Sequence, residues 1–219
     1  MKIFIGVIII RDIGGISRSI VNLLNNIGPE NEITLCVLED YISPNVSLPE
    51  NVRTIKGSML IQDGFIDRAI APSKDLISSV RRYFHRIERR LYGARKYITK
   101  ALDKMVIEDE YDVAISFSND LYDDNGILTA GGVNNLILNK VSALRKVAWI
   151  HNDPRKCGFS RETCLRDFRN FDCVVNVSFD CKNIFDAMVP EYEYKSKVVY
   201  NLYDIDRIKS SFGNNPYDN

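Results

Sequence analysis

Apolar and polar positions follow one another in blocks that predict strand, helix and strand in turn. Residues 2–10 form a continuous apolar, β-branched run, which is typical of a strand buried on both faces of a parallel sheet. Residues 16–27 place apolar side chains at helical spacing, and Gly28–Pro29 ends that helix. Residues 32–40 again have the pattern of a strand. Together these segments predict a parallel βαβ unit with a right-handed crossover.

The rest of the chain continues this alternation after a less regular stretch. Residues 41–63 are irregular apart from a short strand near 52–55, and residues 73–106 are helical, with Gly93 dividing them into two helices. Strands then follow at 113–118, 146–153, 173–178 and 197–202, and helices at 162–171, 179–189 and 205–212. The pattern predicts an α/β, Rossmann-like, doubly wound parallel sheet of six to seven strands. We assign residues 1–203 to this domain and 204–219 to a terminal helix and interdomain linker.

Composition narrows the class of protein without identifying it. The 219 residues are 45% hydrophobic and 26% charged, which excludes collagen-like, low-complexity and wholly disordered chains. Twenty-nine basic residues balance twenty-nine acidic ones, so we expect no nucleic-acid partner. The longest apolar run, residues 3–10, is too short to span a bilayer and lacks the flanks of a signal peptide. Five widely spaced cysteines without a C-x-x-C pair indicate reduced thiols in a cytoplasmic protein and no metal site.

Four segments resemble the N-terminal domain of family-4-type glycosyltransferases of the GT-B fold. IGVIIIRDIGGISRSIVNLLNNI resembles the first strand, glycine loop and first helix of that family, and KVAWIHND resembles the strand that carries its acceptor-side histidine. FDCVVNVSFDCKNIF is similar to the family's "D-x-hydrophobic-hydrophobic-x-x-S" strand and following helix. KSKVVYNLYDIDRI is similar to the segment that closes the domain. The four segments occur in the family's order between residues 1 and 210.

The resemblance implies the acceptor-binding half of a retaining glycosyltransferase. Such an enzyme would transfer a hexose from a nucleotide-sugar to a cell-surface polysaccharide or glycolipid, with no metal and no cofactor beyond the donor substrate. The family grips the donor through a second domain with a glycine-rich loop, a basic pair and a glutamate motif, and none of these occurs in this sequence. We therefore expect the missing C-terminal domain as a partner and little or no activity from this chain alone.

The paired glycines Gly14 and Gly15 are the first candidate binding residues. They lie between the first strand and the first helix, where a backbone without Cβ atoms lets a ligand approach closely. The helix behind them presents unpaired N–H groups suited to a phosphate or a sugar hydroxyl. Ser17 and Arg18 would add a hydroxyl and a cation. The alternative is that the glycines only permit a tight turn and that Arg18 is solvated.

His151 is the candidate catalytic residue. It ends an apolar strand at the expected carboxyl edge of the sheet, where ligands of open α/β sheets bind. An imidazole there can bind a sugar hydroxyl and change its protonation near neutral pH. The resemblance implies a place in the active cleft beside the transferred sugar, with a positional or electrostatic role rather than that of a general base.

Other strand-end residues are candidates by position alone. Asn152 follows His151, and Asp153 is best interpreted as a helix cap that places Pro154 at the first helical position. Ser118, Asn119 and Ser178 end further strands and are predicted acceptor contacts, although helix capping is an equally good interpretation.

The segment 68–100 is a basic amphipathic helix with interleaved aromatic residues. It is expected to lie on an anionic membrane surface, on the inner face of the cell membrane, or else to be an ordinary solvated helix. The residues assigned to membrane contact are Arg81, Arg82, Arg86, Arg89 and Arg90.

Two other functions stay open. A nicotinamide-dependent oxidoreductase is suggested by Glu39 or Asp40 near the end of the second strand, where such enzymes hold a ribose hydroxyl. The loop D-I-G-G-I-S-R, however, lacks the spacing G-x-G-x-x-G. The other alternative is a non-catalytic module that binds a partner through the basic helix.

Overall fold

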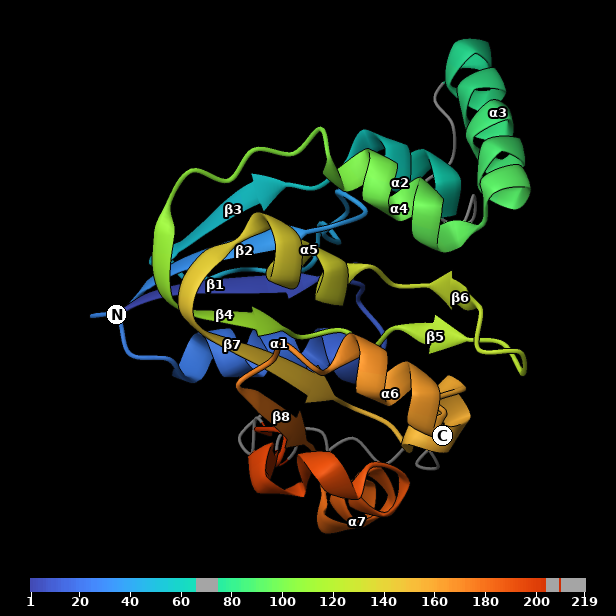
Figure 1. The fold of residues 1–219 in the computed structure, drawn as a ribbon. Coiled ribbons are helices and arrows are strands. Elements are labelled where there is room, and N and C mark those ends of the chain that lie inside the picture. Colours follow the sequence, from blue (N-terminus) through green and yellow to red (C-terminus); the bar gives the residue numbers. More distant parts are fainter. Residues whose placement is uncertain (66–74, 204–208, 210–219) are drawn as a thin grey trace, which may run out of the picture.

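A wholly parallel sheet of seven strands forms the centre of the molecule (Figure 1). The structure is a computed structural model that describes residues 1–65, 75–203 and 209. In spatial order the strands are β3 (Val52–Lys56), β2 (Glu32–Val37), β1 (Lys2–Val7), β4 (Glu110–Ser116), β7 (Ser142–Ile150), β8 (Cys173–Asn176) and β9 (Ser196–Val198). The predicted doubly wound, Rossmann-like α/β fold is confirmed.

The strand order reverses between β1 and β4. From β1 the chain moves outward to β2 and β3, and from β4 it moves the other way to β7, β8 and β9. In the register Gly6 of β1 pairs with Cys36 of β2 and with Ser116 of β4, so the carboxyl ends of these three strands lie at one level. In open α/β sheets the crevice outside such a reversal is where ligands bind.

Helices cover the two faces of the sheet unequally. Seven α-helices and two short 3₁₀-helices are described: α1 (Gly15–Asn26), α2 (Met59–Phe65), α3 (Leu76–Tyr92), α4 (Ala94–Leu102), α5 (Val133–Lys140), η1 (Pro154–Cys157), α6 (Arg161–Asp167), α7 (Phe179–Met188) and η2 (Pro190–Lys195). In the described part of the chain α1 packs on one face, while α2, α4, α5, α6 and α7 pack on the other. Helix α3 projects from the body of the molecule (Figure 1).

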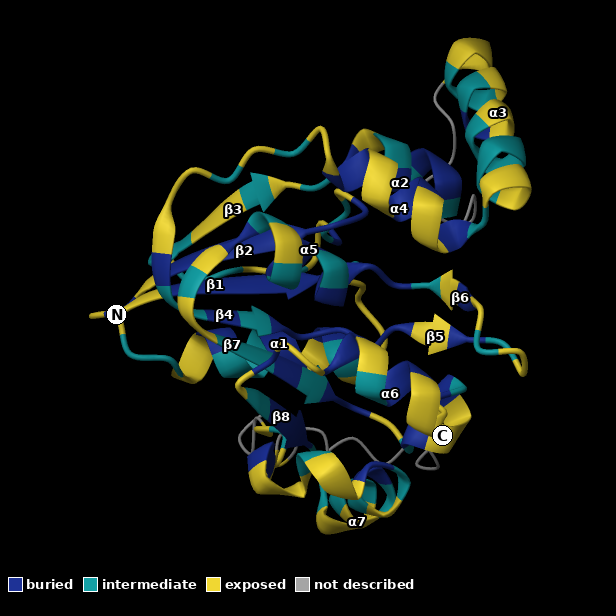
Figure 2. Cartoon of the chain, viewed as in Figure 1, coloured by how far each residue is buried: buried dark blue, intermediate teal, exposed yellow. Residues whose placement is uncertain are grey.

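Two apolar clusters, one on each face, make up the core. Ile20 and Leu24 of α1 pack with Ile5 of β1 on the first face, and Phe117 extends this cluster beyond β4. On the second face the larger cluster joins the other helices to the sheet, with Leu136 of α5 and Phe185 of α7 fully buried. Strands β1 and β2 are accordingly buried on both sides (Figure 2), as their continuous apolar sequences predict.

Several parts of the chain differ from the sequence prediction or fall outside the residues that the structure describes. The loop expected after the fourth strand contains an antiparallel hairpin of β5 (Leu121–Tyr122) and β6 (Leu128–Ala130). Helices α2 and α5 were not predicted, because their short apolar patterns stand inside irregular segments. The expected helix at 205–212 and the linker assigned to 204–219 fall outside the described residues, apart from Lys209.

Gly93 divides α3 from α4 as predicted. None of the described helices combines the length and apolar character that a membrane span needs.

A buried lysine joins η2 to the end of α6. The Lys195 side chain is 4% exposed, and its Nζ donates hydrogen bonds to the carbonyl oxygens of Phe168 (2.7 Å), Arg169 (3.1 Å) and Phe171 (2.9 Å). A cation here bonds carbonyl groups of the loop that follows α6, close to the negative end of that helix. Burial lowers the pKa of Lys195, and the nearby Asp172 acts against this shift.

Replacing Lys195 with methionine is expected to destabilise the fold by about 2–3 kcal/mol, because three buried carbonyl groups lose a charged donor while the side-chain volume is kept. Chemical denaturation followed by circular dichroism measures this change. Lys197→Met on the exposed side of β9 is the matched control and should change stability by less than about 0.5 kcal/mol. Equal effects of the two changes would contradict this role of Lys195.

Candidate ligand site at the carboxyl edge of the sheet

Three consecutive polar residues after β4 hold the neighbouring loops in place. Ser118 Oγ accepts a hydrogen bond from the backbone N–H of Ile8 (3.1 Å), and Asn119 Oδ1 accepts one from the N–H of His151 (3.2 Å). Asp120 Oδ1 accepts a bond from the N–H of Gly132 (2.7 Å). All three side chains are buried. Ser118 and Asn119, predicted as acceptor contacts, are therefore committed to internal bonds and do not face a ligand.

Helix capping accounts for two further strand-end residues. Ser178 Oγ accepts the backbone N–H of Cys181 at the start of α7 (3.1 Å). Asp153 Oδ1 accepts the N–H of Arg155 (3.0 Å), with Pro154 at the first position of η1, as predicted. Ser178 is thus better explained as a cap than as an acceptor contact. Asn152 is exposed between these elements and stays available to a ligand.

The glycine turn opens the amino end of α1 to solvent. Gly14 has a φ of 136°, a conformation that favours glycine, and it precedes the helix without any side-chain cap. The helix begins at Gly15, one residue before the expected start, and a Cβ added to Gly15 would meet no atom within 4 Å. Ser17 is buried, and its Oγ accepts the N–H of Arg11 (3.0 Å) to close the turn. The first turn of α1 holds no acidic residue, so its N–H groups present a partial positive charge.

A polar pocket of about 320 Å³ lies beside this turn. Arg11 and Arg18 are exposed and supply its cationic groups, while Asn22 and Asn45 contribute amides. Asp12, in the same wall, accepts hydrogen bonds from Ser43 and Asn45. Helix N–H groups together with two guanidinium groups can hold a phosphate.

His151 is packed inside the molecule beside the same edge. Its ring lies 4.4 Å from the ring of Phe117 and is stacked on Trp149 at 6.1 Å, and the residue is 9% exposed. Burial lowers the pKa of His151 from 6.5 to about 4, although a hydrogen bond with the backbone of Phe117 acts against the shift. The expected change of protonation near neutral pH is therefore wrong, since the imidazole stays neutral at pH 7.

The His151 and Trp149 rings each have one buried nitrogen without a partner among the described residues. Within the described residues, neither His151 Nε2 nor Trp149 Nε1 forms a hydrogen bond. Since Nε2 is unbonded, the nitrogen that faces the Phe117 backbone is Nδ1. A neutral imidazole held in this way can bind and orient a hydroxyl, but it does not store a proton at neutral pH.

The glycine turn and His151 share an edge and a face of the sheet without lining one pocket. Phe117 belongs to the apolar cluster under α1, and Trp149 packs against that cluster, which places His151 on the α1 side. The pocket beside the glycine turn is bordered by residues 45–47, and its wall includes Ser17 and Arg18 but neither Gly14, Gly15 nor His151. The two predicted features are thus neighbours at the carboxyl edge whose convergence on one ligand stays a prediction.

The arginines assigned to membrane contact divide into buried and exposed members. Arg82 is buried and bonded to Asp63, a wholly buried carboxylate of α2, so its assignment to a membrane face is wrong. Arg81 also pairs with Asp63, at 2.5 Å, and this hydrogen bond raises the pKa of Arg81. The guanidinium of Arg89 lies 4.5 Å above the ring of Phe65.

The other two arginines, Arg86 and Arg90, are half-buried and exposed respectively. Apolar side chains of α3 are exposed as well: Leu76, Ile77, Val80, Tyr83, Phe84, Leu91 and Tyr92. The projecting helix therefore presents an apolar surface beside its arginines.

The two acids that suggest nicotinamide binding differ in access. Glu39 is buried, and burial raises its pKa to about 7, while Arg11 and Arg89 act in the opposite direction. Asp40 is exposed and has a φ of 49°. Only Asp40 is therefore open to a ribose hydroxyl.

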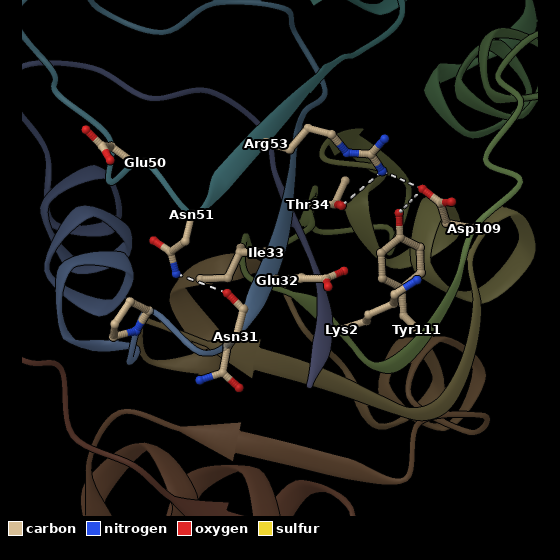
Figure 3. A pocket seen from close by; sticks show the side chains of 11 residues that line it. Lys2, Asn31, Glu32, Ile33, Thr34, Glu50, Asn51, Arg53, Asp109 and Tyr111 are labelled. Atoms are coloured by element: carbon tan, nitrogen blue, oxygen red, sulfur yellow. Dashed lines mark hydrogen bonds and ion pairs between the residues drawn. The ribbon is translucent and has the colours of Figure 1, made fainter.

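A second cavity, of about 440 Å³, lies at the opposite edge of the sheet (Figure 3). Its polar groups are engaged with one another, since Arg53 pairs with Asp109 and bonds Thr34 (3.3 Å), and Asn51 donates to the carbonyl oxygen of Asn31 (3.1 Å). Ligands of parallel sheets bind at the carboxyl ends of the strands. We therefore place the candidate site at the carboxyl edge.

The sequence analysis did not find the ion pairs that Asp167 forms with Arg95 and Arg166. Asp120 at a strand end and the pair Gly131–Gly132 were the signals in the sequence that pointed to this region. Among the described residues no group of three or more histidine, cysteine or acidic side chains is arranged to hold a metal ion. All five cysteines are free. No family model and no curated protein matches this chain.

The contribution of His151 to stability is expected to fall as pH is lowered from 6.5 towards 4, while the raised pKa values of Glu39 and Asp120 act in the opposite direction. The folded-state pKa of His151 lies below that of the unfolded chain, so the unfolded state binds more protons in this window. Burial of the neutral His151 ring should lower the free energy of unfolding by about 2 kcal/mol at pH 5 relative to pH 7. The substitution His151→Phe should remove this loss. Chemical denaturation of the natural chain and of His151→Phe at the two pH values measures this difference. An equal pH dependence of stability in these two proteins would contradict a buried neutral ring at position 151.

Proposed function

We propose that this chain is the acceptor-side domain of a retaining, metal-independent glycosyltransferase. It would serve the transfer of a hexose from a nucleotide-sugar to a cell-surface polysaccharide or glycolipid. The observation that carries the proposal is the glycine turn, because Gly14 and Gly15 open α1 at the reversal of strand order beside a pocket that holds two arginines. The sequence resemblance of four ordered segments supports the same assignment.

In this proposal each part of the edge has a separate task. The N–H groups of α1 and the guanidinium of Arg18 hold donor phosphate oxygens through charge-assisted hydrogen bonds. His151, neutral and fixed by its aromatic neighbours, orients a sugar hydroxyl through Nε2 and is a positioning group rather than a general base. Asn152 is the exposed neighbour that can contact the acceptor.

Catalysis in this proposal also needs a donor-binding domain that closes over the carboxyl edge and excludes water. Sugar transfer by this chain alone should accordingly be very weak or absent. Robust transfer by the isolated chain would contradict the assignment to an acceptor-side domain.

A single carboxylate at the glycine turn is expected to weaken phosphate binding. Gly15→Asp places a negative charge at the first position of α1, where the structure has room for a side chain and the helix dipole favours an acid. Binding of UDP or GDP, followed by shifts of the Gly14, Gly15 and Ile16 amide signals in NMR titrations, should weaken at least about tenfold, or ~1.4 kcal/mol.

Gly15→Asn is the matched control, since it has the same shape without the charge. It should bind the nucleotides within about threefold of the natural protein, which is well under 1 kcal/mol. Absence of nucleotide-dependent shifts at the turn, or equal weakening by Asp and Asn, would remove the phosphate-binding role.

We propose as a second function that α3 binds an anionic membrane surface. The specific observation is the exposed apolar surface of this projecting helix, with Leu76 and Leu91 at 79% and 76% exposure. Arg90 is exposed on the same helix and can pair with anionic headgroups. The same surface serves the alternative of a non-catalytic binding module.

Removing one exposed leucine from α3 is expected to weaken sedimentation with phosphatidylserine vesicles about tenfold, because one buried leucine side chain contributes about 1.5–3 kcal/mol. Leu76→Ser and Leu91→Ser test this contribution, and added salt should weaken binding further. Leu144→Ser on β7, a leucine with the same 79% exposure as Leu76, is the control. Equal losses in all three variants, or no binding by the natural chain at low salt, would contradict membrane contact through α3.

A further inference from the structure

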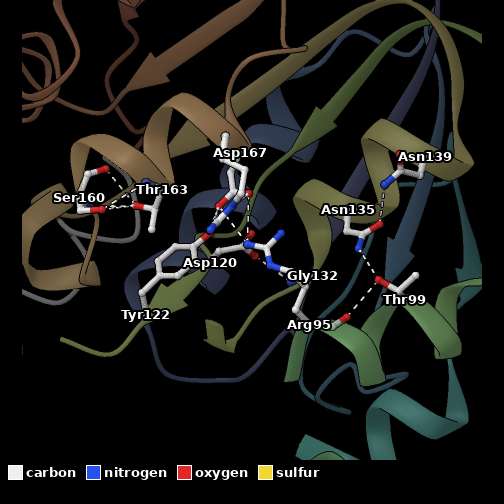
Figure 4. A network of polar contacts seen from close by, with 11 residues as sticks. Arg95, Thr99, Asp120, Tyr122, Gly132, Asn135, Asn139, Ser160, Thr163 and Asp167 are labelled. Carbon is white, nitrogen blue, oxygen red and sulfur yellow. Dashed lines mark hydrogen bonds and ion pairs between the residues drawn. The ribbon is translucent and has the colours of Figure 1, made fainter. Parts of the chain in front are cut away.

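A small polar cavity lies between α4, α5 and α6, on the face of the sheet opposite α1. Its volume is about 190 Å³, and its principal polar lining residues are Arg95, Asp120, Asn134, Asn139, Arg166 and Asp167. Figure 4 shows how side chains from separate elements converge here. Pockets for drug-sized ligands measure roughly 300–1,000 Å³, so this cavity suits a ligand of about one ring.

The charged groups of the cavity neutralise one another. Asp167 is 8% exposed, and its carboxylate accepts hydrogen bonds from Arg95 (3.2 Å to each oxygen), from Arg166 Nε and NH2 (2.9 Å each) and from the hydroxyl of Tyr122 (2.5 Å). Asp120 supplies a second carboxylate. Two guanidinium groups therefore face two carboxylates, and no large net charge is left to attract an ion.

The wall of the cavity is held rigidly by the turn before α5. Gly131 and Gly132 have φ values of 127° and 108°, and a Cβ on Gly131 would lie 2.1 Å from Asp120 Oδ1. The backbone can approach the carboxylate only because Gly131 lacks a side chain, whereas a Cβ on Gly132 would meet Ile98 instead. The bond from the Gly132 N–H then fixes the position of Asp120.

Asn134 is the lining residue whose amide has no partner among the described residues. It is 6% exposed and lines the cavity, yet its amide forms no hydrogen bond within the described residues. The neighbouring amides differ, because Asn135 donates to Thr99 Oγ1 (3.2 Å) and Asn139 donates to Asn135 Oδ1 (2.7 Å). The amide atoms of Asn134 are not among the fully buried atoms without partners, so they are accessible from the cavity, where a ligand can use both the donor and the acceptor.

We propose that this cavity binds a neutral polyhydroxylated ring, the size of one monosaccharide unit. The Asn134 amide can donate to one hydroxyl oxygen and accept from a neighbouring hydroxyl, and the Asp120 carboxylate accepts from another. Leu128 and Leu138 supply apolar wall for the C–H face of such a ring. An anion is disfavoured because both guanidinium groups already bond Asp167, and a cation is disfavoured by those guanidinium groups.

This site is independent of the proposed function. It lies on the α4–α6 face, whereas the glycine turn lies at the start of α1 on the other face. A sugar bound here would belong to a longer glycan or act as a separate ligand, and neither case requires the phosphate site.

The test is an NMR titration of the full chain with the methyl glycosides of glucose, galactose and mannose. At least one glycoside is expected to bind with a dissociation constant in the low millimolar range, about 1–10 mM, and to shift the amide signals of Gly132, Asn134 and Arg95. Asn134→Leu, which keeps side-chain volume but removes the amide, should weaken binding at least tenfold. Asn26→Leu, the same substitution at an exposed position of α1, should leave it unchanged.

Each possible outcome bears on the proposal. No shift with any of the three glycosides, shifts produced by inorganic phosphate instead, or unchanged affinity in folded Asn134→Leu would overturn it. If thermal melting shows that Asn134→Leu does not fold, the natural chain still decides, because sugar-induced shifts must centre on Gly132 and Asn134. Loss of nucleotide binding in Gly15→Asp with retained sugar binding would separate this site from the proposed phosphate site.

Discussion

The carboxyl edge of this protein depends on three consecutive side chains after β4. In a parallel sheet the strands end together, and the loops that leave them carry backbone N–H groups without sheet partners. Ser118, Asn119 and Asp120 each accept one such group, from the segments that follow β1, that continue β7 and that begin α5. One tripeptide thus sets the relative positions of the loop before the glycine turn, of His151 and of the polar cavity.

Internal pairing also explains why charge patterning is a poor guide to the surface of this chain. The segment 68–100 is strongly basic in sequence, but two buried acids from other elements form ion pairs with three of its arginines. Asp63 holds Arg81 and Arg82, and Asp167 holds Arg95. What distinguishes α3 is therefore the exposure of its apolar residues more than its positive charge. An apolar helix face left in water is unfavourable, which is why it is the feature of α3 that calls for a partner.

The fold was largely predictable from the sequence, and the site only in part. Continuous apolar strands, helical stripes and Gly93 are local signals, and each predicted the correct element. The burial of His151 depends on Phe117, just after β4, and on Trp149 of β7, and no local pattern encodes that packing. The burial of Arg82 needs Asp63 of the unpredicted α2, and the cavity at Asn134 needs three helices to converge. The roles assigned from the sequence were therefore wrong at positions whose burial depends on contacts between distant segments.

Strand-end polar residues in this fold divide into those that support the edge and those left free to bind. Ser118, Asn119 and Ser178 bond backbone N–H groups, so a substitution there would displace loops and reduce any activity without a lost ligand contact. His151 Nε2 and the Asn134 amide have no such task among the described residues: the first is buried without a partner, and the second is accessible from the polar cavity. Both groups can therefore bond a ligand without breaking a contact that supports the edge. They lie on opposite faces of the sheet and are linked through Asn119 and Asp120, adjacent members of the tripeptide that holds the edge together.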